Sequence, residues 1–188
     1  MKNIKYIILS IIVTGSVAMM AQSQHITSEK ASIKWTANKV GGSHNGTIEL
    51  KEGHLNWDHD QITSGKFVVD MQSIKNSDLT DAGYNKKLVD HLKSADFFGV
   101  EEFPEAVLEI IGSTVLAGNK YQVMANLTIR GITHPIEFDA LKEGDKLMAT
   151  LTVDRSKYEV KYRSKAFFQN LGDKLIYDDF TLEIVVTK

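Results

Sequence analysis

Residues 121–130 read YQVMANLTIR, and this stretch alternates strictly between apolar and polar side chains. Tyr121, Val123, Ala125, Leu127 and Ile129 share one parity. A strand places successive side chains on opposite faces, so the stretch predicts a strand with one face buried and the other in water.

The same two-residue period recurs along most of the chain. Further strands are expected at 33–37, 47–50, 54–57, 67–71, 107–111, 132–140, 147–153 and 180–186. Clusters of turn-forming residues lie between them at 41–43, 117–119 and 143–145. Eight or nine strands at this spacing predict an all-β sandwich or barrel with antiparallel neighbours, and they exclude a parallel α/β fold.

One segment has a helical period instead. Between residues 81 and 93, Tyr84, Leu88 and Leu92 recur at helical spacing, and Asp81 stands where an N-terminal cap belongs. The pattern predicts a single amphipathic helix. The aromatic residues that follow, at 97, 98 and 103, predict a turn that folds over one end of the sheet, and residues 155–170 are expected to form a long loop or a short helix.

The N-terminus has the layout of a secretory signal peptide. Lys2 and Lys5 precede an apolar run from 6 to 17, and small residues follow at 18, 21 and 23. Cleavage after Ala21 and cleavage after Ser23 both fit. No basic cluster follows the apolar run, so a retained membrane anchor fits less well. We therefore expect a signal peptide at 1–23, one domain at 24–188, a periplasmic or secreted location, and no stable membrane insertion after cleavage.

Composition excludes several classes of protein. The 188 residues are 43% hydrophobic and 24% charged, with a formal net charge of -2, as in a single globular domain without the basic surplus that nucleic-acid binding requires. The absence of cysteine excludes disulfides, thiolate metal sites and a lipidated cysteine. Removal of the two signal lysines leaves 20 basic residues against 24 acidic ones, so we expect no attraction of the chain as a whole to an anionic membrane.

No motif predicts catalysis. Ser43 and His44 lie among glycines, but Asn45 stands where a nucleophile elbow needs a second glycine, and adjacent side chains on a strand point to opposite faces. Glu101 and Glu102 are neighbours in an acidic surface turn, which makes acid–base chemistry a weak hypothesis. We expect no catalytic residue.

One acidic segment offers potential metal ligands, His54, Asp58, His59 and Asp60. A metal site needs such groups to converge on one ion. These residues fall where a hairpin turn is expected, so solvated turn residues are the better interpretation. We expect no metal and no cofactor.

Several motifs in order resemble the YceI-like family of polyisoprenoid-binding proteins. They are GSHNGTI at 42–48, GKFVVDM at 65–71, HLKSADFF at 91–98, Phe103-Pro104 and LTIRGIT at 127–133. The resemblance extends over about residues 32–186. It implies an extended eight-stranded antiparallel lipocalin-like barrel with a short helical insertion, in a secreted or periplasmic protein. It also implies that an internal apolar channel holds a long isoprenoid or a similar amphiphilic lipid, such as an isoprenoid quinone or a polyprenyl phosphate.

Parity and the resemblance together nominate residues for the channel wall, although a slip of one residue would invert each set. They are Trp35, Ile48, Phe67, Val69, Phe97, Phe98, Leu108, Ile110, Val123, Leu127, Ile129 and Phe138. The candidates for contact with a lipid head group are Ser43, His44, Asn45, His91, Arg130 and Arg155. The two arginines suit a pyrophosphate by charge and geometry, and solvated surface arginines are the alternative.

Sequence alone thus predicts a non-enzymatic lipid carrier or sequestering protein. A hydrolase or metalloenzyme, which would need converging polar groups, is one alternative. The other is a ligand-free stress or interaction protein, whose barrel would be filled by side chains. An eight-stranded barrel permits both a carrier and a ligand-free protein, because its interior is just wide enough to be filled or to hold one small ligand. The lipid, its head group and the oligomeric state stay open, a homodimer included.

Overall fold

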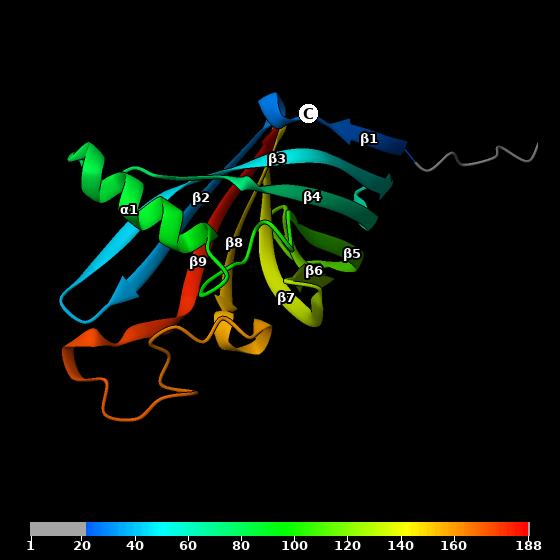
Figure 1. Ribbon diagram of the computed structural model, residues 1–188. Coiled ribbons are helices and arrows are strands. Elements are labelled where there is room, and N and C mark those ends of the chain that lie inside the picture. The colour runs from blue at the N-terminus through cyan, green and yellow to red at the C-terminus, as the bar shows by residue number, and fades with distance from the viewer. Residues whose placement is uncertain (1–21, 188) are drawn as a thin grey trace, which may run out of the picture.

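The computed structural model describes residues 22–187, which form one antiparallel barrel (Figure 1). The predicted signal peptide lies outside the described residues except for Gln22 and Ser23, which begin the first strand.

Eight strands close the barrel. They are β2 (Ala31–Lys39), β3 (Gly42–Asp58), β4 (Gln61–Asn76), β5 (Glu105–Val115), β6 (Lys120–Ile129), β7 (Ile132–Glu143), β8 (Lys146–Asp154) and β9 (Ile176–Thr187). Strands that follow one another in the chain pair in antiparallel fashion. Strand β9 also pairs with β2 in antiparallel fashion, which closes the ring. The ninth strand, β1 (Gln22–Ile26), extends the edge of β3 beyond the end of β2, pairing Gln22 with Trp57. The predicted all-β, eight-stranded barrel is confirmed.

Most predicted turns are present, and two details of β3 differ from the prediction. Hairpins at 117–119 and 143–145 join β5 to β6 and β7 to β8. The first turn occupies Val40 and Gly41, so β3 already begins at Gly42. The expected strands 47–50 and 54–57 are parts of this one strand, because an irregularity in its pairing with β4 between Leu50 and Glu52 interrupts the alternation without ending the strand.

The helix α1 (Ala82–Lys93) is the single α-helix of residues 22–187. The predicted cap is present, since the Asp81 carboxylate accepts a hydrogen bond from the Tyr84 N–H at 2.9 Å. The predicted apolar face is wrong at Tyr84, which is 69% exposed, whereas Leu88 and Leu92 are half-buried. The helix packs through its C-terminal half, so its first turn faces water.

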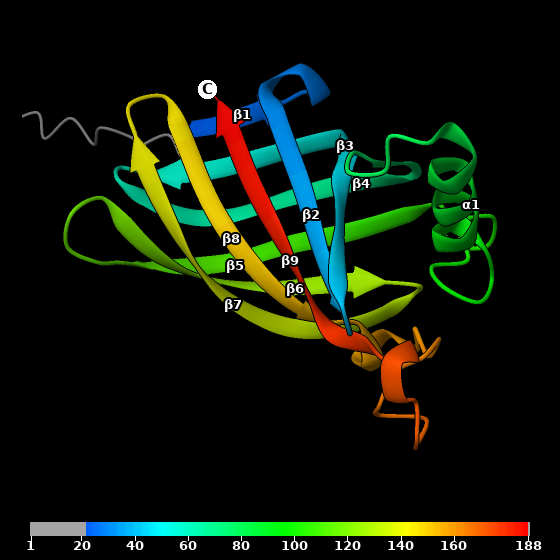
Figure 2. The ribbon, with the colours of Figure 1, turned by 90° about the vertical axis from the view of Figure 1, so that its left-hand side faces the viewer.

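The two ends of the barrel are formed by different elements (Figure 2). The β3–β4, β5–β6 and β7–β8 hairpins gather at one end, and α1 lies at the other end together with the segment between β8 and β9. That segment contains two short 3-10 helices, at Arg155–Tyr158 and Gly172–Lys174, and is otherwise irregular. The predicted loop at 155–170 is thus present.

Candidate functional site: an apolar cavity in the barrel

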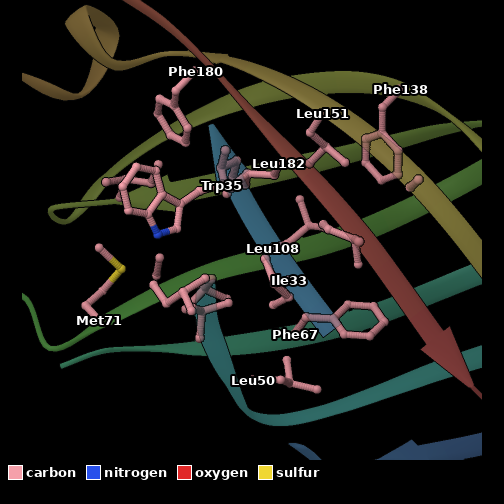
Figure 3. Close-up of a pocket in the computed structure, with 18 of the residues that line it drawn as sticks. Ile33, Trp35, Leu50, Phe67, Met71, Leu108, Phe138, Leu151, Phe180 and Leu182 are labelled. Atoms are coloured by element: carbon pink, nitrogen blue, oxygen red, sulfur yellow. The ribbon is translucent and has the colours of Figure 1, made fainter. Parts of the chain in front are cut away.

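A cavity of about 170 Å³ lies inside the barrel. All eight barrel strands and α1 contribute to its lining, and the labelled side chains in Figure 3 point into a common space. Among the thirty-two described residues that line it, Arg155 alone carries a charge. The cavity wall is therefore almost wholly hydrocarbon.

The twelve residues predicted for the channel wall all line this cavity. Phe67, Val69 and Phe138 are only half-buried although they face the interior, because the space beside them is empty. Their contact with a lipid stays a prediction.

Sequence reasoning did not name many other lining residues, for example Ile33, Leu50, Met71, Ile74, Leu92, Leu151, Phe180, Leu182 and Ile184. Several share the parity of a named neighbour, as Ile33 does with Trp35, so the alternation carried the signal that could have found them. The same holds for β9, whose apolar residues Phe180, Leu182 and Ile184 share one parity and all line the cavity.

Trp35 is fixed against the neighbouring strands. Its indole Nε1 donates a hydrogen bond to the Lys75 carbonyl at 3.1 Å. The ring passes so close to Gly46 that a Cβ there would lie 2.8 Å from it and 1.9 Å from the Lys75 oxygen. Glycine at this position permits the large ring to form part of the cavity wall.

Aromatic rings line the α1 end of the cavity. The rings of Phe97 and Phe98 lie 5.1 Å apart between centroids, and that of Phe98 lies 6.4 Å from Phe180. The turn that carries Phe97 and Phe98 is held by Arg130, whose guanidinium donates to the backbone carbonyls of Ala95 and Phe97. The predicted aromatic turn over one end of the sheet is thus present.

Arg155 is 3% exposed and lies at the same end, over the ring of Phe97 at 5.4 Å. Its Nη2 atom lies 3.3 Å from the Asp178 carboxylate. Burial lowers the pKa of Arg155, and the negative charges of Asp178 and Asp154 oppose that shift. The guanidinium donates hydrogen bonds to four backbone carbonyls, those of Val160, Tyr162, Ile176 and Tyr177. These bonds fix the segment before β9 across the end of the barrel.

His91 lies beside this cluster. Its ring packs against Tyr162 at 4.3 Å and Phe97 at 5.8 Å between centroids. Its Nε2 atom is buried and has no hydrogen-bond partner among the described residues. Of the six head-group candidates, His91, Arg130 and Arg155 therefore lie at this aromatic end, and only Arg155 lines the cavity.

The other four head-group candidates lie outside the cavity lining. Ser43, His44 and Asn45 belong to the start of β3, where His44 Nδ1 lies 2.8 Å from Asp78. The Asn45 N–H donates to the same carboxylate at 2.8 Å. Partial burial would raise the pKa of Asp78, but the hydrogen bonds from Asn45, His44 and Asn76 lower it below its ordinary value. Arg130 is engaged in holding the aromatic turn.

One lining residue reaches solvent. Tyr177, at the start of β9, is 45% exposed and is the most exposed of the described lining residues. Because it touches both the cavity and water, we call its surroundings the mouth of the cavity.

Residues 22–187 contain no group of three or more His, Asp or Glu side chains placed to hold a metal ion. His59 of the candidate acidic segment pairs with Asp58, at 2.7 Å, in an exposed turn. No helix within the described part of the chain has the length and apolar character needed to cross a membrane.

The YceI-like domain family matches the chain over residues 24–188. This protein belongs to the YceI-like family. The matched range covers the whole barrel and includes every described residue that lines the cavity. The resemblance carried by the dispersed motifs is confirmed.

Solved structures share the fold. BcnA from Burkholderia cenocepacia is 19% identical, with a TM-score of 0.67 over 86% of this chain and 99% of BcnA. A polyisoprenoid-binding domain from Saccharophagus degradans, implicated in plant cell wall breakdown, is 11% identical, with a TM-score of 0.56 over 89% of this chain and 97% of that domain. At these identities the likeness establishes the fold alone.

Curated relatives match a smaller part. The UPF0312 protein of Pseudomonas putida is 29% identical over 119 residues, which are 62% of this chain and 59% of that protein. A UPF0312 protein of Staphylococcus aureus is 32% identical over 83 residues, or 38% of this chain and 46% of that protein. The match thus spans about three fifths of the length of the P. putida relatives.

Proposed function

We propose that this YceI-like protein binds a long isoprenoid lipid, or a similar amphiphilic lipid, inside its barrel without chemically changing it. The observation that carries the proposal is the hydrocarbon wall of the cavity, with one charged residue among thirty-two. Support comes also from the polyisoprenoid-binding domain that shares the fold. We further propose a periplasmic or secreted location, as the predicted signal peptide implies.

Apolar contact is sufficient to hold such a ligand. Burial of one methylene is worth about 0.8 kcal/mol, so each five-carbon unit inside contributes roughly 4 kcal/mol before ordering costs. A water molecule needs roughly 10–15 Å³ of such space, so the cavity holds on the order of a dozen heavy atoms, or roughly two to three isoprene units. A longer chain must widen the cavity or extend through the mouth.

The polar head group then belongs at the mouth and not in the interior. The guanidinium of Arg155 donates to four backbone carbonyls and its Nη2 lies 3.3 Å from Asp178, so the charged residue among the described cavity-lining residues is already engaged. An anionic group inside would lose its hydration without gaining a partner. We therefore expect the head group beside Tyr177, with the apolar chain pointing inward.

Mass spectrometry of a solvent extract tests the proposal directly. The protein is purified after export from a bacterial host, extracted with organic solvent, and analysed for co-purified lipid. A stoichiometric polyprenyl lipid is expected. An extract that stays empty, even after incubation with isoprenoid quinones and polyprenyl phosphates, would favour the ligand-free interaction protein instead.

Filling the cavity should abolish lipid capture. Ala149 lines the cavity opposite Ala140 on the neighbouring strand, so a phenyl ring in Ala149→Phe occupies the space of the ligand. The next residue, Thr150, is exposed on the outer face, and Thr150→Phe is the matched control. We expect the extract of Ala149→Phe to lose its lipid and that of Thr150→Phe to keep it. Equal lipid in both variants would contradict binding in this cavity.

A further inference from the structure

The segment between β8 and β9 projects from the α1 end of the barrel (Figure 1) and leads into the start of β9, where Tyr177 marks the mouth. We call residues 159–175 of this segment the mouth loop. Its tip carries two adjacent phenylalanines in water, Phe167 at 38% and Phe168 at 50% exposure. Such rings cost free energy in water, and two of them at one projecting tip indicate a surface that another phase or molecule covers.

The tip is held in one conformation. The N–H groups of Phe167 and Phe168 both donate to the Ser164 carbonyl, at 3.2 and 3.0 Å. Ser164 itself is fully buried, and its hydroxyl oxygen accepts a hydrogen bond from the Ala166 N–H at 3.1 Å. The two rings are therefore presented by an ordered turn, which lowers the entropic cost of inserting them elsewhere.

Basic residues share the mouth loop with these rings. The mouth loop contains four basic residues and two acidic ones, whereas the whole chain has a net charge of -2. Lys161 pairs with Glu159 and lies 5.1 Å from the ring of Phe167. The other three, Arg163, Lys165 and Lys174, are exposed and form no ion pair with any residue of 22–187. The mouth loop is thus locally positive, although the chain as a whole is negative. The expectation of no attraction to an anionic membrane concerned the chain as a whole.

Exposed aromatic rings flanked by unpaired cations are the pattern of a segment that lies in a membrane interface. The rings enter the boundary between head groups and acyl chains, and the cations meet anionic phosphates. The far end of the barrel lacks this combination. Its β5–β6 hairpin also exposes apolar side chains, Val115 at 50% and Leu116 at 42%, but residues 115–120 contain a single basic residue, Lys120.

We propose that the mouth loop docks the protein on an anionic lipid bilayer, with Phe167 and Phe168 inserted and Arg163, Lys165 and Lys174 over the lipid phosphates. Arg155 connects this loop to the backbone of Ile176 and Tyr177 at the mouth. Docking therefore places the mouth against the bilayer, so that a lipid can enter or leave without crossing water. The docking surface itself does not depend on what the cavity holds.

Sedimentation with lipid vesicles tests the docking surface. The exported protein is mixed with vesicles of phosphatidylcholine alone or of phosphatidylcholine and phosphatidylglycerol in equal parts. It should pellet with the anionic vesicles, less at high salt, and little with the neutral ones. The double variant Phe167→Ser/Phe168→Ser should bind the anionic vesicles about tenfold more weakly. The matched control, Ile111→Ser/Met124→Ser, removes exposed apolar side chains from β5 and β6 and should bind like the parent.

Three outcomes would overturn the proposal. They are absence of the parent protein from the anionic pellet, undiminished binding by the phenylalanine variant, and equal loss in the control variant. Unfolding midpoints of both double variants that equal the midpoint of the parent show that folding is intact. Ala149→Phe separates docking from lipid uptake, because it fills the cavity and leaves the mouth loop unchanged. It should still pellet, and its loss from the pellet would assign the vesicle binding to the cavity instead.

Discussion

At the scale of single residues, Gly46 determines whether the cavity wall can form. Gly46→Ala would place a Cβ 1.9 Å from the Lys75 oxygen and 2.8 Å from the Trp35 ring, so strand or ring must move. Such overpacking costs about 1–3 kcal/mol and sometimes more. We expect a fall of this size in the free energy of unfolding in urea. Gly42→Ala is the control, since nothing lies within 4 Å of a Cβ there. Equal stability of the two variants would contradict the close packing.

Arg155 is the second residue whose role the structure makes specific. Arg155→Met would leave four carbonyls and Asp178 without their buried partner, which costs about 3–5 kcal/mol for a broken buried pair. We expect this loss in urea unfolding, together with faster amide exchange in residues 155–177. Arg163→Met, an exposed arginine without an ion pair among the described residues, should change stability little. Slow exchange in Arg155→Met would refute the anchoring role.

At the scale of elements, regular alternation was predictable and its interruption was not. In β3 the buried side chains are Leu50 and then Leu55 and Trp57, so the inward parity changes along one continuous strand. The irregularity near Leu50 shifts the pairing with β4, and a bulge of this kind leaves no mark in the sequence except a broken period. A broken period looks like a strand end, which explains the division into two strands. The expectation that Tyr84 belongs to the buried face of the helix was wrong for a related reason. Periodicity does not show how much of a helix packs against the barrel.

The connection between β4 and α1 should respond to acid. Asp78 accepts bonds from His44 and from the Asn45 N–H, and these bonds help lower its pKa in the folded protein. A lowered folded pKa means that the carboxylate stabilises the fold above its ordinary pKa of about 4, and that this stabilisation is lost as the pH falls through the folded pKa. Thermal unfolding from neutral to acidic pH should show a smaller acid-induced decrease for Asp78→Asn than for the parent.

Asp173→Asn is the control for acid unfolding. Asp173 is exposed in the mouth loop and forms no ion pair among the described residues. This variant should follow the parent curve at every pH. Parallel curves for the parent and Asp78→Asn would show that the carboxylate does not stabilise this connection.

At the scale of the whole molecule, the cavity arises from where small residues meet after the barrel closes. Ala140 and Ala149 face each other across β7 and β8, and Ala31, Ala37 and Ala106 line other parts of the wall. The sequence contains these alanines, but their common position depends on the register of strands that are distant in the chain. The candidate wall could therefore be predicted from alternation, whereas the empty space could not. Net charge likewise does not describe the mouth loop, which carries four basic residues and two acidic ones.

A bound lipid should stabilise the barrel as a whole, because it fills the empty core only in the folded state. At a free ligand concentration about 100 times Kd the gain is about 2.7 kcal/mol, and with about 2–4 °C per kcal/mol for a domain of this size Tm should rise by roughly 5–11 °C. Geranylgeraniol is a suitable probe, and differential scanning calorimetry measures the shift. Ala149→Phe should show no shift, since its ring occupies the cavity. Phe167→Ser/Phe168→Ser should show the full shift in solution, since its cavity is intact. An equal rise in Ala149→Phe and the parent would locate the lipid outside the barrel and separate the stabilisation from the cavity.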